Sequence, residues 1–163
     1  MDISKQVPVY FTVIRYIKNK TTWVQLTCAL LIILFIYTGL NKLMGYEKFK
    51  FEMGRSPFIQ HMNGFIAAVL PAGELLLALL LIVKKTRLVG LYLSYMLMAL
   101  FTGYIALMLT YAYDLPCSCG GVLSAMSWKD HLVFNGVFTG LCVMGIICET
   151  GIRREIRSMK QVK

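Results

Sequence analysis

The sequence predicts an all-α membrane protein built as a bundle of four transmembrane helices. Of its 163 residues, 58% are hydrophobic, and the mean hydropathy is +0.66. These values are too apolar for a soluble domain of this length. Four apolar runs also approach the ~20 residues that a helix needs to cross a bilayer. The predicted spans are residues 22–43, 65–83, 88–113 and 128–149.

The chain is predicted to divide into three parts. Residues 1–21 form an N-terminal cytoplasmic or interfacial segment, whose apolar residues recur at helical spacing among basic ones. This pattern is typical of a helix lying on the membrane surface. We expect no removable signal peptide, because no small-residue cleavage site follows the first apolar run. Residues 22–150 form the membrane domain, and residues 151–163 form a basic cytoplasmic tail.

Two connections within the membrane domain have distinctive sequences. Residues 44–64 mix charged and aromatic side chains, which predicts a partly helical segment folded back on the bundle. Ser127 followed by Asp130 resembles a capping box at the start of the fourth helix, with Ser127 as the N-cap. Pro71 interrupts the second span.

The distribution of basic residues predicts that both termini are cytoplasmic. Twelve lysines and arginines then lie inside and five outside, as the positive-inside rule requires. We therefore expect a multi-pass protein of a bacterial inner membrane, with lipid as its surroundings. The net charge of +9 reflects topology, so no nucleic-acid partner is predicted. The outside residues are Lys42, Lys48, Lys50, Arg55 and Lys129.

Cys117 and Cys119 are the candidate catalytic residues. Thiols one residue apart close a small, strained ring that is readily reduced, which is typical of exchange-active disulfides. Gly120 and Gly121 follow and allow a partner chain to approach closely. On the predicted topology this loop faces the oxidising periplasm. The alternative is that two small residues line a tight turn.

A supporting cluster of intramembrane polar residues is predicted beneath the Cys117 loop: Lys42, Glu74, His131 and Asn135. Glu74 lies about nine residues, or roughly 13 Å, into its span, where an unpaired carboxylate is costly. We expect it to be neutral or paired with Lys42. His131 and Asn135 share a helix face. His131 is either a proton acceptor or a packing residue, and Asn135 is either functional or an interhelical contact of ~0.6 kcal/mol.

The other sulfur-containing residues carry less chemical information. Cys28, Cys142 and Cys148 lie inside apolar runs and are expected to be core residues. The ten methionines show no ligand-like spacing, so no metal site is predicted, and copper binding together with Cys117 and Cys119 is only a minor alternative.

Several motifs, taken in order, resemble the DoxX-like membrane proteins: Phe35-Ile36-Tyr37-Thr38-Gly39-Leu40-Asn41-Lys42-Leu43, Phe49 and Pro71-Ala72-Gly73-Glu74. The Cys-X-Cys loop, Trp128 and Asn135 narrow this resemblance to the branch that includes methylamine utilisation protein MauE. It covers about residues 25–148. The resemblance implies a four-helix membrane bundle with disulfide chemistry that assists maturation of exported proteins. Gly121 stands where MauE-like chains tend to have an aromatic residue.

Two functions remain open from the sequence. In the first, the protein is a thiol–disulfide oxidoreductase that exchanges with a thioredoxin-like or other exported partner, with quinone as a candidate electron carrier. In the second, it is a non-catalytic membrane subunit or assembly factor that docks a partner through its loop.

The predicted topology is testable by labelling cysteines in intact cells. Cys117 or Cys119 should react with an impermeant thiol reagent after reduction, whereas an engineered Lys163→Cys should not, because the basic residues place the tail inside. Labelling of Lys163→Cys without labelling of the loop would reverse the topology.

Overall fold

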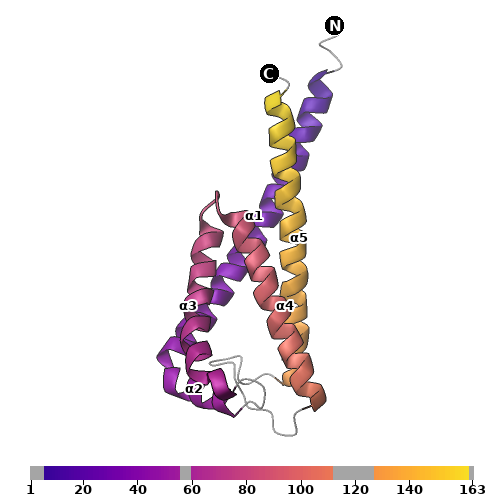
Figure 1. The fold of residues 1–163 in the computed structure, drawn as a ribbon. Coiled ribbons are helices and arrows are strands. Elements are labelled where there is room, and N and C mark those ends of the chain that lie inside the picture. The colour runs from indigo at the N-terminus through magenta and orange to yellow at the C-terminus, as the bar shows by residue number, and fades with distance from the viewer. Residues whose placement is uncertain (1–5, 56–59, 112–126, 162–163) are drawn as a thin grey trace.

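The computed structural model describes residues 6–55, 60–111 and 127–161, and all regular structure in these ranges is helical. A long first helix is followed by a short one, a single 3-10 turn and three further long helices (Figure 1). The elements are α1 (Gln6–Met44), α2 (Tyr46–Gly54), η2 (Gln60–Met62), α3 (Asn63–Ile82), α4 (Arg87–Tyr111) and α5 (Trp128–Gln161).

Four of these helices, α1, α3, α4 and α5, are each long and apolar enough to cross a membrane, so the protein is a multi-pass membrane protein. Large apolar side chains also point outward from every span. Such an outer surface suits lipid rather than water. Examples that are more than half exposed are Ile33, Leu76, Met96 and Val137.

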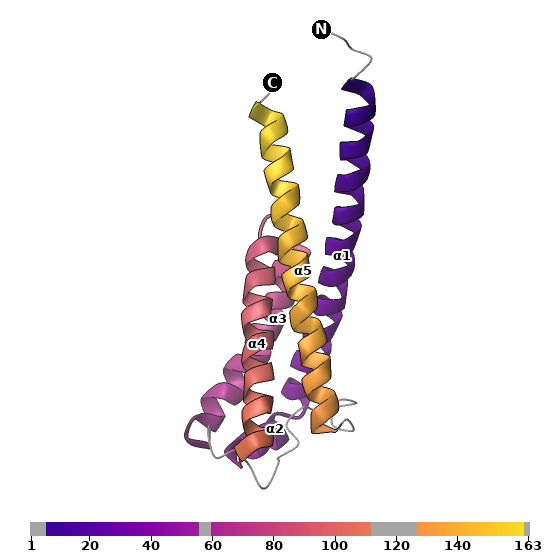
Figure 2. The same ribbon diagram turned by 90° about the vertical axis from the view of Figure 1, so that its right-hand side faces the viewer.

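The two ends of the bundle differ. At one end the start of α1 and the end of α5 reach beyond the turn between α3 and α4, and we call this the termini end (Figures 1 and 2). At the other end α2 lies beside the start of α3, and we call this the α2 end. Phe49 and Met53 of α2 pack there on Ala67 of α3, as the predicted fold-back requires.

The expectation of a separate N-terminal interfacial helix is wrong. α1 runs without a break from Gln6 into the first span. Residues 18–22, Lys-Asn-Lys-Thr-Thr, contain neither Gly nor Pro, and once a helix is nucleated each further residue extends it readily. Thr22 adds a bond from its hydroxyl to the Lys18 carbonyl, at 3.1 Å.

The fourth span begins as predicted and ends later. Asp130 donates its backbone N–H to the Ser127 hydroxyl oxygen at 3.3 Å, which confirms Ser127 as the N-cap of α5. The helix then continues to Gln161, through most of the residues predicted as the basic tail. Lys20 of α1 and Glu155 of α5 form an ion pair of 3.7 Å in this extension.

Glycine allows close helix contacts near the termini end. A Cβ on Gly145 of α5 would lie 3.1 Å from Leu91 Cδ2 on α4 and 3.3 Å from Thr27 Cγ2 on α1. Gly90 of α4 meets Leu81 of α3 at a similar distance. Small residues let helix backbones approach in this way inside a membrane. The main core, which includes Leu31, Phe35, Leu81 and Leu91, fills the space between these contacts.

Gly145→Val should destabilise the bundle by about 1–3 kcal/mol, because the added methyl groups overpack the meeting point of α1, α4 and α5. Gly140→Val is the matched control on the same helix, since a Cβ there would meet no atom within 4 Å. Unfolding of both variants in detergent measures the difference. Equal stability would contradict the close packing at Gly145.

Candidate functional site

The predicted catalytic residues, Cys117 and Cys119, lie outside the described residues. α4 ends at Tyr111 and α5 begins at Trp128, both at the α2 end of the bundle (Figure 1). The candidate site can therefore be built from the polar side chains that the helices bring together at this end.

Lys42 of α1 and Glu74 of α3 form a buried ion pair. Lys42 Nζ donates to Glu74 Oε1 at 2.5 Å, and the two residues are only 7% and 1% exposed. Glu74 stands eleven residues after the start of α3 at Asn63, about 16 Å along the helix. Two opposite charges are thus held together at a depth where either alone would be very unfavourable.

Close contact between α1 and α3 sets this pair within bonding distance. One turn before Lys42, a Cβ on Gly39 would lie 3.2 Å from Leu75 Cγ and 3.4 Å from the Pro71 carbonyl oxygen. Pro71 is itself buried, one turn before Glu74. A larger residue at position 39 would push the helices apart at the level of the ion pair.

Two aromatic rings flank the Lys42 ammonium group. Its Nζ lies 5.8 Å from the ring centroid of Phe49 on α2 and 5.8 Å from that of Phe101 on α4. Such separations are typical of cation–π contacts, which grow stronger when the cation is desolvated. The Phe49 ring of α2 therefore covers Lys42 from the α2 end of the bundle. The Phe101 ring covers it from the side of α4.

The ion pair uses only one of the two carboxylate oxygens of Glu74. Glu74 Oε2 is buried and has no hydrogen-bond partner in the described part of the chain. Thr38 lies one turn before Lys42 and its hydroxyl is close to the Glu74 carboxylate, but it donates to the Leu34 carbonyl at 2.9 Å. An acceptor this deeply buried usually has a partner, which makes Oε2 the most informative atom of the site.

His131 and Asn135 occupy the buried face of α5 at the same end. α1 and α5 run antiparallel and meet at Thr27 and Gly145. Lys42 lies fifteen residues after Thr27, so it is at about the same height in the bundle as residue 130 of α5. His131 is the next residue of α5. The structure thus shows the Lys42–Glu74 ion pair and, at about the same depth on α5, the buried side chains of His131 and Asn135. That the four residues act as one cluster stays a prediction.

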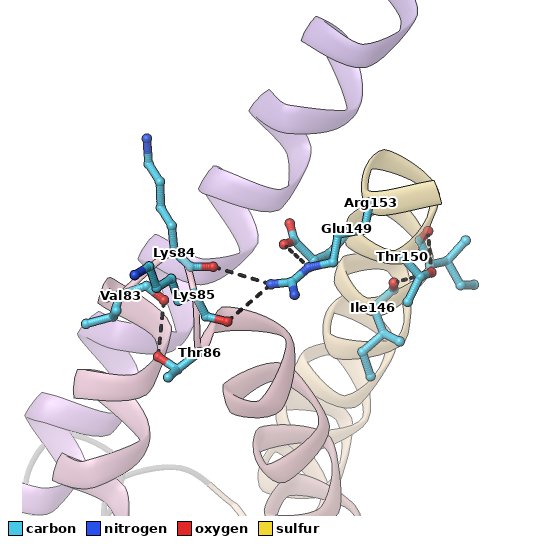
Figure 3. Close-up of polar contacts among 9 residues, drawn as sticks. Val83, Lys84, Lys85, Thr86, Ile146, Glu149, Thr150 and Arg153 are labelled. Carbon is cyan, nitrogen blue, oxygen red and sulfur yellow. Dashed lines mark hydrogen bonds and ion pairs between the residues drawn. The ribbon is translucent and has the colours of Figure 1, made fainter. Parts of the chain in front are cut away.

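A second polar network, which was not predicted, lies at the termini end (Figure 3). Arg153 Nε donates to Glu149 at 2.9 Å, and Arg153 Nη2 donates to the Lys84 and Lys85 carbonyls at 3.3 and 3.5 Å. These bonds tie α5 to the turn between α3 and α4. The i,i+4 spacing of Glu149 and Arg153 is the signal that the sequence offered.

Sequence reasoning also missed the roles of Phe49 and Phe101. Phe49 was named in the family resemblance without a role, and Phe101 was one of many apolar residues in its span. Only the packing of α2 and α4 around Lys42 shows what the two rings contact. In the described ranges, no group of three or more His, Cys, Asp or Glu side chains is placed to hold a metal ion.

The fold and the buried pair define a small four-span membrane protein with a charged site inside the bundle. The chain belongs to the family described as methylamine utilisation protein MauE, whose family model matches residues 19–148. That match covers all four spans apart from the far end of α5. No curated protein and no solved structure matches the chain.

A double-mutant cycle will measure the coupling within the pair. Lys42→Met or Glu74→Leu alone should cost about 3–5 kcal/mol, because each leaves its partner buried without compensation. Lys42→Met combined with Glu74→Leu should restore most of that loss, since no charge then remains. Glu74→Gln should be the mildest single change because it keeps an acceptor for Lys42.

The measurement is the unfolding free energy of each variant in detergent. Strictly additive losses in the double variant would show that Lys42 and Glu74 do not stabilise each other.

Proposed function

We propose that the protein is a membrane thiol–disulfide oxidoreductase whose reactive groups are Cys117 and Cys119. The observation that carries this proposal is the Cys-X-Cys sequence, which follows α4 and precedes α5 along the chain. The buried Lys42–Glu74 pair inside the bundle supports it. A strained small-ring disulfide exchanges readily. A buried charged pair in a membrane bundle generally marks a functional region.

The proposed reaction is thiol–disulfide exchange with an exported thioredoxin-like protein. The thiolate of one cysteine attacks a disulfide sulfur of the partner and forms a mixed disulfide. The second cysteine of the pair then displaces the partner, which leaves as a dithiol, and the Cys117–Cys119 disulfide closes. The reverse sequence oxidises the partner. His131, which is buried in the first turn of α5, is the proposed proton acceptor for a thiol.

A membrane quinone is the proposed partner for the electrons that the thiol pair gains or loses. A single thiol pair needs a second redox group to turn over, and a lipid-soluble two-electron carrier suits a protein with this much lipid-facing surface. The predicted cellular setting, the inner membrane of a bacterium with the loop in the periplasm, provides such carriers.

The alternative function is a non-catalytic membrane subunit or assembly factor. Apolar side chains that remain exposed at the α2 end favour it, namely Met44, Phe51 and Phe65, which are 87%, 69% and 63% exposed. In this case the loop cysteines would only shape a docking surface.

Redox titration of the Cys117–Cys119 pair separates the two functions. The pair should change between dithiol and disulfide at potentials above about −300 mV, where strained and exchange-active bridges lie. Cys117→Ser should keep the fold and abolish thiol exchange. Cys148→Ser is the matched control, because Cys148 is a half-buried thiol in the middle of the described α5.

Mass spectrometry after equilibration in dithiothreitol or glutathione buffers gives the readout. A bridge that stays oxidised below about −300 mV would be structural and would contradict the oxidoreductase. Unchanged exchange in Cys117→Ser would do the same and would favour the docking function.

A further inference from the structure

We propose that the termini end of the bundle binds the phosphate group of an anionic phospholipid. The binding residues form a basic surface that consists of Lys84, Lys85, Arg87 and Arg157. None of them takes part in the proposed thiol chemistry, so each proposal can be tested without the other. The surface combines residues of the α3–α4 turn, the start of α4 and the last turns of α5.

The described residues of the termini end carry more positive than negative charge. The acidic residues among them are Glu149 and Glu155. Glu149 accepts a hydrogen bond from Arg153, and Glu155 pairs with Lys20. The excess of positive charge attracts anions to this end of the bundle. The other described cationic side chains of this end form no ion pair with any described residue, and they are Lys18, Lys84, Lys85, Arg87, Arg154 and Arg157.

Arg153 brings two parts of the basic surface together. Its Nη2 donates to the carbonyl oxygens of Lys84 and Lys85, at 3.3 and 3.5 Å, which holds the α3–α4 turn against α5 (Figure 3). Arg157 follows Arg153 by four residues and so lies on the same face of α5, about 6 Å further along the axis. The side chains of Lys84, Lys85 and Arg157 are exposed. Three exposed cations from two segments therefore lie on the same side of the bundle.

Arg87 adds a guanidinium group with unused hydrogen-bond donors. It is half-buried at the start of α4 and makes no hydrogen bond or ion pair with any described residue. Its Nε is buried without a partner in the described ranges, whereas its two terminal nitrogens are not buried. A guanidinium presents its N–H groups as a planar fork that fits phosphate oxygens in pairs. Packing around Nε thus holds a phosphate-binding group at the surface.

The position of the basic surface favours a lipid over a free anion. α3 ends at Ile82 and α4 begins at Arg87, so the turn between them lies where both spans leave the hydrocarbon and phospholipid phosphates lie. Exposed apolar side chains border the basic residues, namely Ile82, Val83 and Val89, which are 55%, 44% and 54% exposed. These side chains suit the acyl chains of a lipid whose phosphate is bound. A choline group would add a positive charge beside the lysines, so an anionic head group is favoured.

The test measures the lipid preference of the full chain in nanodiscs at about 0.15 M salt, where screening limits the reach of a charge to roughly 8 Å. Spin-labelled phosphatidylglycerol should associate with the unaltered protein about tenfold more strongly than spin-labelled phosphatidylcholine. Arg87→Gln should lower this preference about threefold or more, because it removes the phosphate-binding guanidinium. Lys84→Gln combined with Lys85→Gln should do the same, because it removes two of the exposed cations.

Lys18→Gln is the matched control, because Lys18 is an exposed lysine at the same end with no ion pair in the described part of the chain. It stands two residues before Lys20, which pairs with Glu155 on α5, and so points away from α5. Loss of its charge should leave the preference within about 1.5-fold of that of the unaltered protein. Equal losses in Lys18→Gln and Arg87→Gln would show a diffuse attraction and overturn the site.

Inorganic phosphate at millimolar concentration should not displace the bound lipid. Displacement would identify a free-anion site and contradict lipid binding. The double lysine variant keeps the test decisive if Arg87→Gln fails to fold, because both lysine side chains are exposed and Arg153 bonds only their backbone carbonyls. An unchanged lipid preference in that variant would overturn the basic surface as the binding site.

Discussion

The bond between Lys42 and Glu74 constrains the whole α2 end, because neither charge is stable alone in hydrocarbon. Keeping the two charges together requires α1 and α3 to be in close contact, and Gly39 supplies that contact one turn earlier on α1. It also requires cover from the end of the bundle, which Phe49 of α2 provides. The fold-back of the short α2 helix is thus as much a part of the charged site as the two spans that carry it.

The termini end is held together by close glycine contacts and by hydrogen bonds of Arg153. Here Gly90 and Gly145 bring α1, α3, α4 and α5 into direct contact, and the charged groups sit at the rim. Arg153 bonds Glu149 and the carbonyls of the α3–α4 turn. The Arg153 side chain is 40% exposed and that of Glu149 is 12% exposed, so this pair is less deeply buried than Lys42 and Glu74. The bundle therefore has close helix contacts at the termini end and a buried charged pair between α1 and α3 further towards the α2 end.

The sequence predicted the features that the membrane itself imposes. Span length follows from bilayer thickness, and Glu74 attracted notice because a carboxylate is rare at such depth. The extra N-terminal helix was a wrong prediction, because an amphipathic pattern says where apolar residues lie and not where a helix bends. Phe101 could not be predicted, since a ring that faces Lys42 and one that faces lipid look alike in a sequence. Cys117 and Cys119 lie outside the described residues, so their roles rest on the sequence.

An internal charged pair is a poor device for stability, since well-packed apolar residues of similar volume would usually serve as well or better. The free energy lost by burying two charges is more easily explained if the pair performs a task that apolar residues cannot. Glu74 Oε2, which has no partner among the described residues, shows that the hydrogen-bonding capacity of the pair exceeds what its own bond uses. The pair, held together by α1, α2 and α3, is therefore better explained by a functional task than by stability.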